Sequence, residues 1–210
     1  MMTSLPPLNT KVLKGTTTIG VRCADGVILA TDRRVTSGFY ISNKRGRKII
    51  RIDDHVAATI AGVVADAQML MEQVKTAANL YKLTNSRPMP VKAVATITSN
   101  ILFSSRFAPY IMQAIVAGVD YTGPRMFNLD PFGTLTEERY IATGSGSPMA
   151  LGVLEAHYYD GITIKEALPI VVRAVNSSMK WDPGSGEGFD IALITSLGIR
   201  EVPSEEYKEG

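Results

Sequence analysis

The chain has 210 residues, 45% of them hydrophobic, which is enough apolar material for one well-buried domain. Its 22 basic and 20 acidic residues leave a formal charge of +2, so nothing points to nucleic acid or a membrane surface as a partner. The single cysteine, Cys23, excludes an intrachain disulfide and fits a reducing compartment, and the two histidines lack metal-ligand spacing. We therefore expect no metal, no cofactor and no histidine triad.

The first fifteen residues form a polar leader that ends in Lys14-Gly15. The leader contains two prolines and lacks the uninterrupted apolar core of a secretory signal. No stretch of the sequence is apolar for long enough to span a bilayer. We interpret residues 1–15 as a propeptide or a loosely packed extension.

Four β-rich runs follow the leader, at Thr17–Cys23, Val27–Thr31, Ile49–Ile52 and Val56–Ile60. Asp25-Gly26 between the first two is a strong hairpin signal, and Cys23 falls in an apolar strand pattern that places it in the core. Residues 33–48 mix glycines with aromatic side chains, which predicts irregular strands and turns.

Two helices come next, because apolar residues then recur at helical spacing. The first is predicted over Val64–Leu83 and the second over Val91–Phe107, where Pro109 closes it. Strand signals return at Ile111–Val119, Met126–Leu129 and Tyr140–Thr143, with a turn at residues 130–133 between the last two.

The third helix is predicted to begin at Ser147-Pro148, with serine as N-cap and proline at the first helical position. Thr163 and Glu166 form a capping box that opens a fourth helix, which runs to about Trp181. A last strand is expected over Phe189–Ser196, followed by a polar, mobile tail from Glu201 to Gly210.

The order of elements is strands, two helices, strands, two helices and a strand. Without strict β-α alternation, this order predicts an α+β fold in which largely antiparallel sheets lie between helix pairs. No linker divides the chain, so we expect one domain.

The run Lys14-Gly15-Thr16-Thr17-Thr18 raises a chemical possibility. A threonine at a free N-terminus carries its own base, because its α-amine has a pKa of about 8 and can accept the proton of its own hydroxyl. Inside a chain the same threonine is an ordinary strand residue, and β-branched runs are common in strands. Taken alone, the run therefore favours a strand.

Four other segments carry polar or small residues: Thr31-Asp32-Arg33-Arg34, Lys44–Lys48, Ala142–Ser147 and Asp182–Gly188. Each has an ordinary explanation. Asp32 and Arg33 can form a surface ion pair, the basic turn can be a solvated loop, and the Asp182 segment can be a turn. The Gly144–Ser147 loop can bind a phosphate at a helix start, but it lacks the lysine end of a P-loop.

Taken together, these segments resemble the β-subunit of the proteasome in its archaeal form. The matching segments are Gly15–Gly20, Asp25–Arg34, Gly46–Lys48, Thr59–Gly62, Ala65–Gln68, Thr143–Pro148, Gly152–Glu155, Arg173-Ala174, and Asp182 with Ser185-Gly186. They run in order over nearly the whole chain. The resemblance implies an N-terminal nucleophile hydrolase fold, a four-layer αββα sandwich of two antiparallel sheets between helix pairs.

The resemblance also implies a threonine endopeptidase mechanism. Thr16 would become the first residue after self-cleavage of Gly15-Thr16, and its hydroxyl would attack the peptide carbonyl with its α-amine as base. Lys48 would lie beside that hydroxyl, Asp32 would hold Lys48, and the Gly62 N–H would serve as the oxyanion hole. The remaining residues carried over, which orient the amine and its water, are Ser145, Asp182 and Ser185.

Substrate binding is implied in the same way. The residues expected to line or border the pocket are Val35, Gly46, Ile50, Ile60, Gly62, Val64 and Gln68, and their apolar character suggests cleavage after hydrophobic residues. Several of these residues can equally be core. Thr36 is expected to hydrogen-bond an extended substrate through its backbone.

The implied partners are copies of this chain or a sister subunit in a heptameric β-ring, α-subunit rings, an unfolding ATPase and polypeptide substrates, in the cytoplasm. Three alternatives stand beside this one: a non-catalytic ring subunit, a bacterial relative in a simpler ATPase-dependent particle, and a small-molecule amidase of the same fold. The Gly15-Thr16 junction, Asp32 and Lys48 favour the catalytic subunit. Trp181 and Glu187 depart from the family pattern, and neither removes a catalytic group.

Overall fold

A computed structural model describes residues 15–202. Its elements, in chain order, are β1 (Thr18–Arg22), β2 (Val27–Asp32), β3 (Val35–Ser37), β4 (Tyr40–Asn43), β5 (Ile49–Asp53), β6 (Val56–Gly62), α1 (Val64–Asn85), α2 (Val91–Ser104), β7 (Met112–Asp120), β8 (Gly123–Leu129), β9 (Leu135–Glu137), β10 (Tyr140–Thr143), α3 (Ser147–His157), α4 (Ile164–Trp181), β11 (Phe189–Thr195) and β12 (Gly198–Val202).

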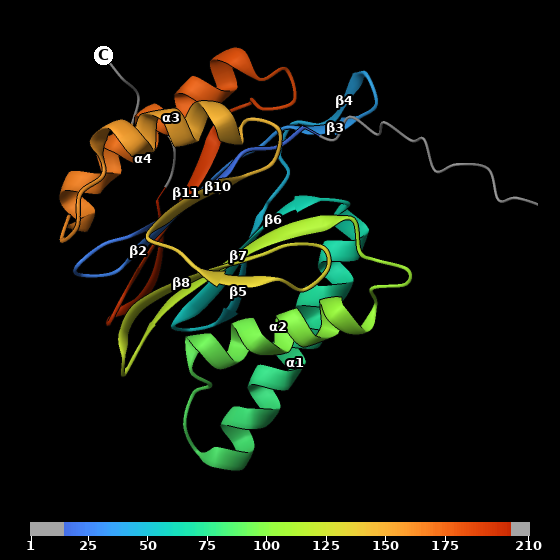
Figure 1. Ribbon diagram of the computed structural model, residues 1–210, viewed down its shortest axis with the longest axis vertical. Coiled ribbons are helices and arrows are strands. Elements are labelled where there is room, and N and C mark those ends of the chain that lie inside the picture. The colour runs from blue at the N-terminus through green and yellow to red at the C-terminus, as the bar shows by residue number, and fades with distance from the viewer. Residues whose placement is uncertain (1–14, 203–210) are drawn as a thin grey trace, which may run out of the picture.

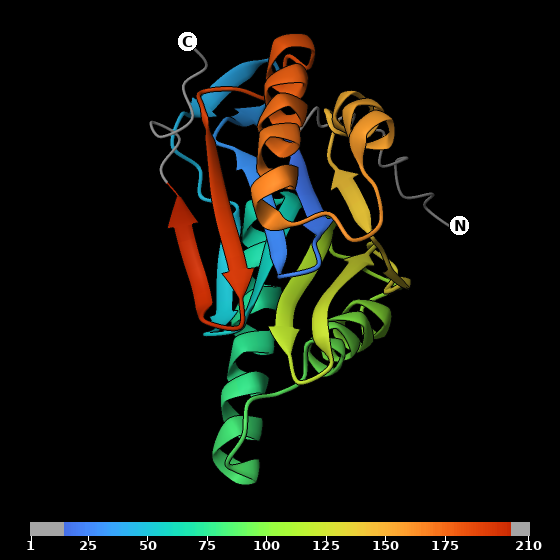
Figure 2. The same cartoon turned by 90° about the vertical axis from the view of Figure 1, so that its left-hand side faces the viewer.

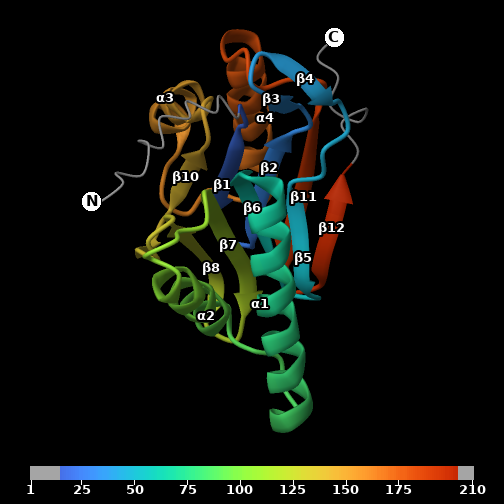
Figure 3. The same cartoon turned by 90° about the vertical axis from the view of Figure 1, so that its right-hand side faces the viewer.

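Two five-stranded antiparallel sheets lie face to face between two pairs of helices (Figure 1). Helices α3 and α4 cover the sheet ordered β10-β1-β2-β11-β12, and α1 and α2 cover the sheet ordered β5-β6-β7-β8-β9. Figure 2 shows the red strands β11 and β12 at one edge of the first sheet, and Figure 3 shows β10 at its other edge. The predicted α+β fold with four layers is confirmed.

Three hydrophobic clusters fill the spaces between these layers. Ile28 of β2 belongs to the cluster under α3 and α4, whereas its neighbour Leu29 belongs to the cluster between the sheets. Because successive strand residues point to opposite faces, β2 is buried on both sides, and this explains its uninterrupted apolar run. The third cluster, under α1 and α2, contains Leu70, Val94 and Phe127.

The β1–β2 hairpin was predicted from Asp25-Gly26 and is confirmed. Its register pairs Arg22 with Val27 at the turn and Thr18 with Thr31 at the open end. The Asp25 side chain accepts a hydrogen bond of 2.8 Å from the backbone nitrogen of Ile164, so the turn is tied to the start of α4. The open end of the hairpin carries the threonine run and Asp32.

The other local predictions had mixed outcomes. The Thr163–Glu166 capping box is confirmed, and Cys23 is buried as predicted. Serine as the N-cap of α3 was wrong, because Gly146 takes that position and Ser147 is already helical. Helix α2 ends at Ser104 and not at Phe107. Beyond it, the chain turns and the Arg106 guanidinium lies over the rings of Phe103 and Phe107, at 4.4 Å and 4.5 Å from their centroids.

The first two residues of the expected mobile tail lie in a strand. Glu201 and Val202 belong to β12, which pairs with β11, and Val202 is buried. The prediction was therefore wrong for these two residues, since pairing with a distant strand orders them. The rest of the predicted tail, residues 203–210, lies outside the described residues, as do residues 1–14 of the predicted propeptide.

Candidate active site

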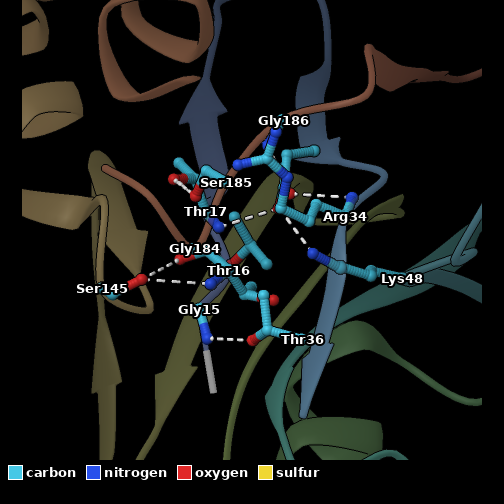
Figure 4. A network of polar contacts seen from close by, with 12 residues as sticks. Gly15, Thr16, Thr17, Arg34, Thr36, Lys48, Ser145, Gly184, Ser185 and Gly186 are labelled. Atoms are coloured by element: carbon cyan, nitrogen blue, oxygen red, sulfur yellow. Dashed lines mark hydrogen bonds and ion pairs between the residues drawn. The ribbon is translucent and has the colours of Figure 1, made fainter. Parts of the chain in front are cut away.

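The open end of the β1–β2 hairpin forms the centre of a polar site (Figure 4). Asp32 ends β2 and Lys48 lies just before β5, and both side chains are almost completely withdrawn from solvent, at 0% and 7% exposure. Figure 4 shows Thr16 between Ser145 on one side and Lys48 on the other. The structure thus brings together residues that are far apart in the sequence.

Asp32 is the best-connected carboxylate of the site. Its Oδ1 accepts hydrogen bonds from Lys48 Nζ at 2.5 Å and from the Thr17 backbone nitrogen at 2.9 Å. Its Oδ2 accepts from the backbone nitrogens of Arg34 at 3.0 Å and Gly186 at 3.1 Å. Three backbone donors and one ammonium therefore compensate the burial of this charge.

Lys48 is a buried cation held by that carboxylate. Burial lowers the pKa of its ammonium from the ordinary 10.5, and the charge and hydrogen bond of Asp32 oppose the shift without cancelling it. Two opposing effects therefore act on this lysine: burial disfavours its charged form, and the Asp32 carboxylate favours it.

A second carboxylate, Asp182, organises the opposite side of Thr16. Its Oδ2 accepts hydrogen bonds from the hydroxyls of Ser145 and Ser185, each at 2.6 Å. Ser145 Oγ in turn accepts a hydrogen bond of 3.1 Å from the Thr16 backbone nitrogen. Since Ser185 donates to Asp182, the hydroxyl of Thr17, 2.7 Å away, donates to Ser185.

Gly15, the residue before Thr16, is held in place on both sides. Its backbone nitrogen donates to Thr36 Oγ1 at 2.9 Å. A Cβ added to Gly15 would lie 1.9 Å from the Cα of Gly184, so the two glycine backbones pack in direct contact. Any larger residue at either position would push these segments apart.

A cleft of about 530 Å³ opens beside Thr16. Of the residues expected at the substrate pocket, Val35, Thr36, Gly46, Ile60, Gly62, Val64 and Gln68 line it together with Lys48. Ile50 is not among the lining residues, and it packs against the cluster under α1 and α2. A second cleft of about 360 Å³ lies on the other side of Gly15, between the β3–β4 hairpin and Asp182.

Four residues to which the sequence pattern assigns no role also complete the site: Thr17, Arg34, Gly184 and Gly186. The Arg34 guanidinium donates to the carbonyl of Pro183 at 2.7 Å and to Glu187 at 3.3 Å, so it fixes the loop that follows α4. The double arginine after Asp32 was the only available signal for this role. Glu187 is therefore part of the loop's support.

Trp181 ends helix α4 and is 69% exposed, just before Asp182. None of the hydrogen bonds that support Thr16 involves its side chain.

Within residues 15–202, no three or more histidine, cysteine, aspartate or glutamate side chains gather in a way that could hold a metal ion. In the same range, no helix combines the length and the apolar character needed to cross a membrane.

Comparison with known proteins supplies the family. The model of the proteasome subunit family matches residues 12–194. "Proteasome subunit beta" of Methanothermobacter thermautotrophicus is 46% identical over 198 residues, which cover 94% of each chain. "Proteasome subunit beta 1" of Pyrobaculum calidifontis is 48% identical over 195 residues, 92% of this chain and 97% of the relative.

This chain belongs to the proteasome subunit family. The predicted resemblance is confirmed, and the two-sheet sandwich described above agrees with the fold expected from it.

Proposed function

We propose that this chain is a catalytic β-subunit of a proteasome core particle, a threonine endopeptidase that becomes active when it cleaves its own Gly15-Thr16 bond. The observation that carries the proposal is the position of the Thr16 nitrogen. It donates to Ser145 Oγ, which is held by Asp182, while Lys48, which is paired with Asp32, lines one cleft together with Thr16. The atom that cleavage would turn into a free amine is already hydrogen-bonded.

In the proposed self-cleavage, Thr16 Oγ1 attacks the carbonyl carbon of Gly15 and the bond from that carbon to the Thr16 nitrogen breaks. The resulting ester is hydrolysed by water, which leaves a carboxylate on Gly15 and a free amine on Thr16. The close contact between Gly15 and Gly184 and the hydrogen bond to Thr36 hold the scissile bond in a defined geometry, which favours an intramolecular attack.

In peptide hydrolysis, the α-amine of Thr16 would take the proton of the hydroxyl as it attacks the substrate carbonyl. Lys48 would stabilise the developing alkoxide, with Asp32 keeping it in place. The backbone N–H of Gly62, which lines the cleft at the end of β6, would stabilise the oxyanion. Ser145, Ser185 and Asp182 would orient the amine and the water that releases the product.

The apolar part of the cleft, formed by Val35, Ile60 and Val64, supports cleavage after hydrophobic residues. Thr36 would pair with the backbone of an extended substrate. We further propose that the subunit assembles into a heptameric β-ring between α-subunit rings and receives unfolded chains from an ATPase. A reducing, cytoplasmic setting fits its single buried cysteine.

The test is a Thr16→Ala variant compared with wild type and Thr16→Ser in assembled particles, by mass spectrometry and peptide hydrolysis. We expect wild-type β-subunits to begin at Thr16, and the alanine variant to keep its leader and hydrolyse nothing. Thr16→Ser, which keeps a hydroxyl, should retain processing. A wild-type particle that keeps residue 1 and hydrolyses no peptide would instead identify a structural ring subunit, and hydrolysis by the alanine variant would exclude Thr16 as nucleophile.

A further inference from the structure

The cleft beside Thr16 has a charged side that the catalytic residues do not use. Besides Lys48, its lining includes Arg45 and Arg47, on the connection between β4 and β5, and within residues 15–202 it includes no aspartate or glutamate. Lys48 is neutralised by Asp32 at 2.5 Å. The positive charge of the cleft therefore comes from the two arginines.

Both arginines are exposed, and neither forms an ion pair with any residue in the range 15–202. The nearby carboxylates are already engaged: Asp190 with Arg33 at 2.6 Å, and Glu187 with Arg34 at 3.3 Å and Lys44 at 3.7 Å. Arg45 and Arg47 also line a neighbouring hollow with Arg33, Lys44, Glu187 and Asp190, so the positive surface continues beyond the cleft.

Hydrogen bonds hold the backbone around Arg45 in place. The side chain of Asn43 accepts a hydrogen bond of 2.7 Å from the backbone nitrogen of Arg45, which closes a turn at the end of β4. Gly46 follows, with its backbone nitrogen held by the Arg33 carbonyl at 2.9 Å. The backbone that carries the two arginines is therefore pinned at two points while their guanidinium groups remain available.

We propose that Arg45 and Arg47 form a carboxylate-binding subsite, so that the cleft prefers peptides with an acidic side chain at the second or third residue on the N-terminal side of the cleaved bond. This inference rests on the proposed function and extends it to substrate choice. Guanidinium groups bind carboxylates through two parallel hydrogen bonds, and a positive cleft that lacks carboxylates also disfavours lysine and arginine in the substrate.

The size of the preference follows from the exposure of the two arginines. An exposed ion pair typically changes an equilibrium by about twofold to fivefold, so two cations acting on one carboxylate should give a preference of about threefold to tenfold. Exposed charges are screened by salt, because the Debye length falls from about 10 Å at 0.1 M to about 3 Å at 1 M, so the preference should shrink as salt is added.

The experiment uses assembled wild-type particles and fluorogenic peptides that end in a leucyl amide. Glu, Gln or Lys is placed one or two residues before the leucine. We expect kcat/KM for the Glu peptide to exceed that of its Gln partner by about threefold to tenfold at one or more positions. The ratio should approach one in 0.5 M salt and in an Arg45→Gln, Arg47→Gln double variant.

Arg87→Gln is the matched control, because Arg87 is an exposed loop arginine outside both clefts, and it should keep the wild-type ratio. If the double variant fails to assemble, the ratio of kcat/KM for Glu and Gln peptides in the two single variants, and its salt dependence in wild type, still test the inference. Equal hydrolysis of Glu and Gln peptides by wild type, or a preference that survives in the double variant, would overturn the inference. Failure of wild type to hydrolyse the Gln peptides would count against the proposed function itself.

Discussion

Asp32→Asn should destabilise the fold far more than Lys48→Met, although the two side chains form one ion pair. Asp32 accepts four hydrogen bonds, three of them from backbone nitrogens. Within residues 15–202, the one hydrogen bond of the Lys48 ammonium is to Asp32. After Lys48→Met the carboxylate keeps its three backbone donors. After Asp32→Asn the ammonium loses its counter-charge, and the amide NH₂ faces backbone N–H groups that it cannot accept from.

The magnitudes separate the two variants. Removing one partner of a buried pair costs about 3–5 kcal/mol when the other charge is left uncompensated. Lys48→Met should cost less, about 2 kcal/mol. It removes one hydrogen bond to the charged Asp32 carboxylate, worth about 1.5–3 kcal/mol, and leaves the three from backbone nitrogens. Asp32→Asn adds about 1–3 kcal/mol for each buried N–H left unpaired. We expect a difference of at least about 2 kcal/mol.

The assay is urea denaturation followed by far-UV circular dichroism, with both substitutions made in a Thr16→Ala background so that no chain is processed. The pH dependence gives a second check. Without Asp32, the pKa of Lys48 in the folded state should fall further below 10.5. The unfolded state of Asp32→Asn then binds more protons than the folded state, so the stability of this variant should rise as the pH is raised toward 10.5. If Lys48→Met proves as destabilising as Asp32→Asn, the donor-based reasoning is wrong.

Three further predictions concern other parts of the chain. Gly184→Ala should slow cleavage of the Gly15-Thr16 bond, measured by mass spectrometry, because its Cβ would lie 2.2 Å from the Gly15 Cα; chains supplied without the leader should be far less affected. Burial opposes ionisation of Asp53, but the hydrogen bonds from Lys82 and the Asp54 backbone nitrogen, together with the positive charge of Lys82, outweigh it and hold the pKa of Asp53 below 3.8. Wild type should therefore be more stable than Asp53→Asn above pH 4, and this difference should vanish as the pH falls through the pKa of Asp53 in the folded state. Urea midpoints of the two proteins that stay apart at pH 2 would contradict this. Burial raises the pKa of the Cys23 thiol to about 12, so iodoacetamide should label it only after unfolding, and rapid labelling of the native protein would refute its core position.

Most of the fold was predictable because its signals are local. Asp25-Gly26 fixed the first hairpin, the capping box of Thr163 fixed the start of α4, and helical periodicity fixed α1. The strands β9 and β12 were missed, since each is short, partly polar and ordered by pairing with another strand rather than by its own sequence.

The site was predictable only through the family resemblance, and then only in part. Nothing in the local sequence indicates that Asp32 would accept a hydrogen bond from Gly186, 154 residues away, or that Gly184 would contact Gly15. Such contacts depend on how distant loops approach one another, and residue type alone does not encode that distance.

The register of one sheet explains why these distant loops meet at Asp32. In β2, Thr31 pairs with Thr18 on one side and Asp190 on the other, and Asp32 pairs with Phe189. This places the carboxylate beside the threonine run and beside the loop that leads into β11. A slip of one residue would put Thr31 in the place of Asp32 and turn the carboxylate to the opposite face, which would leave Lys48 without a counter-charge. The catalytic arrangement that we propose is thus inseparable from the strand pairing that builds the core.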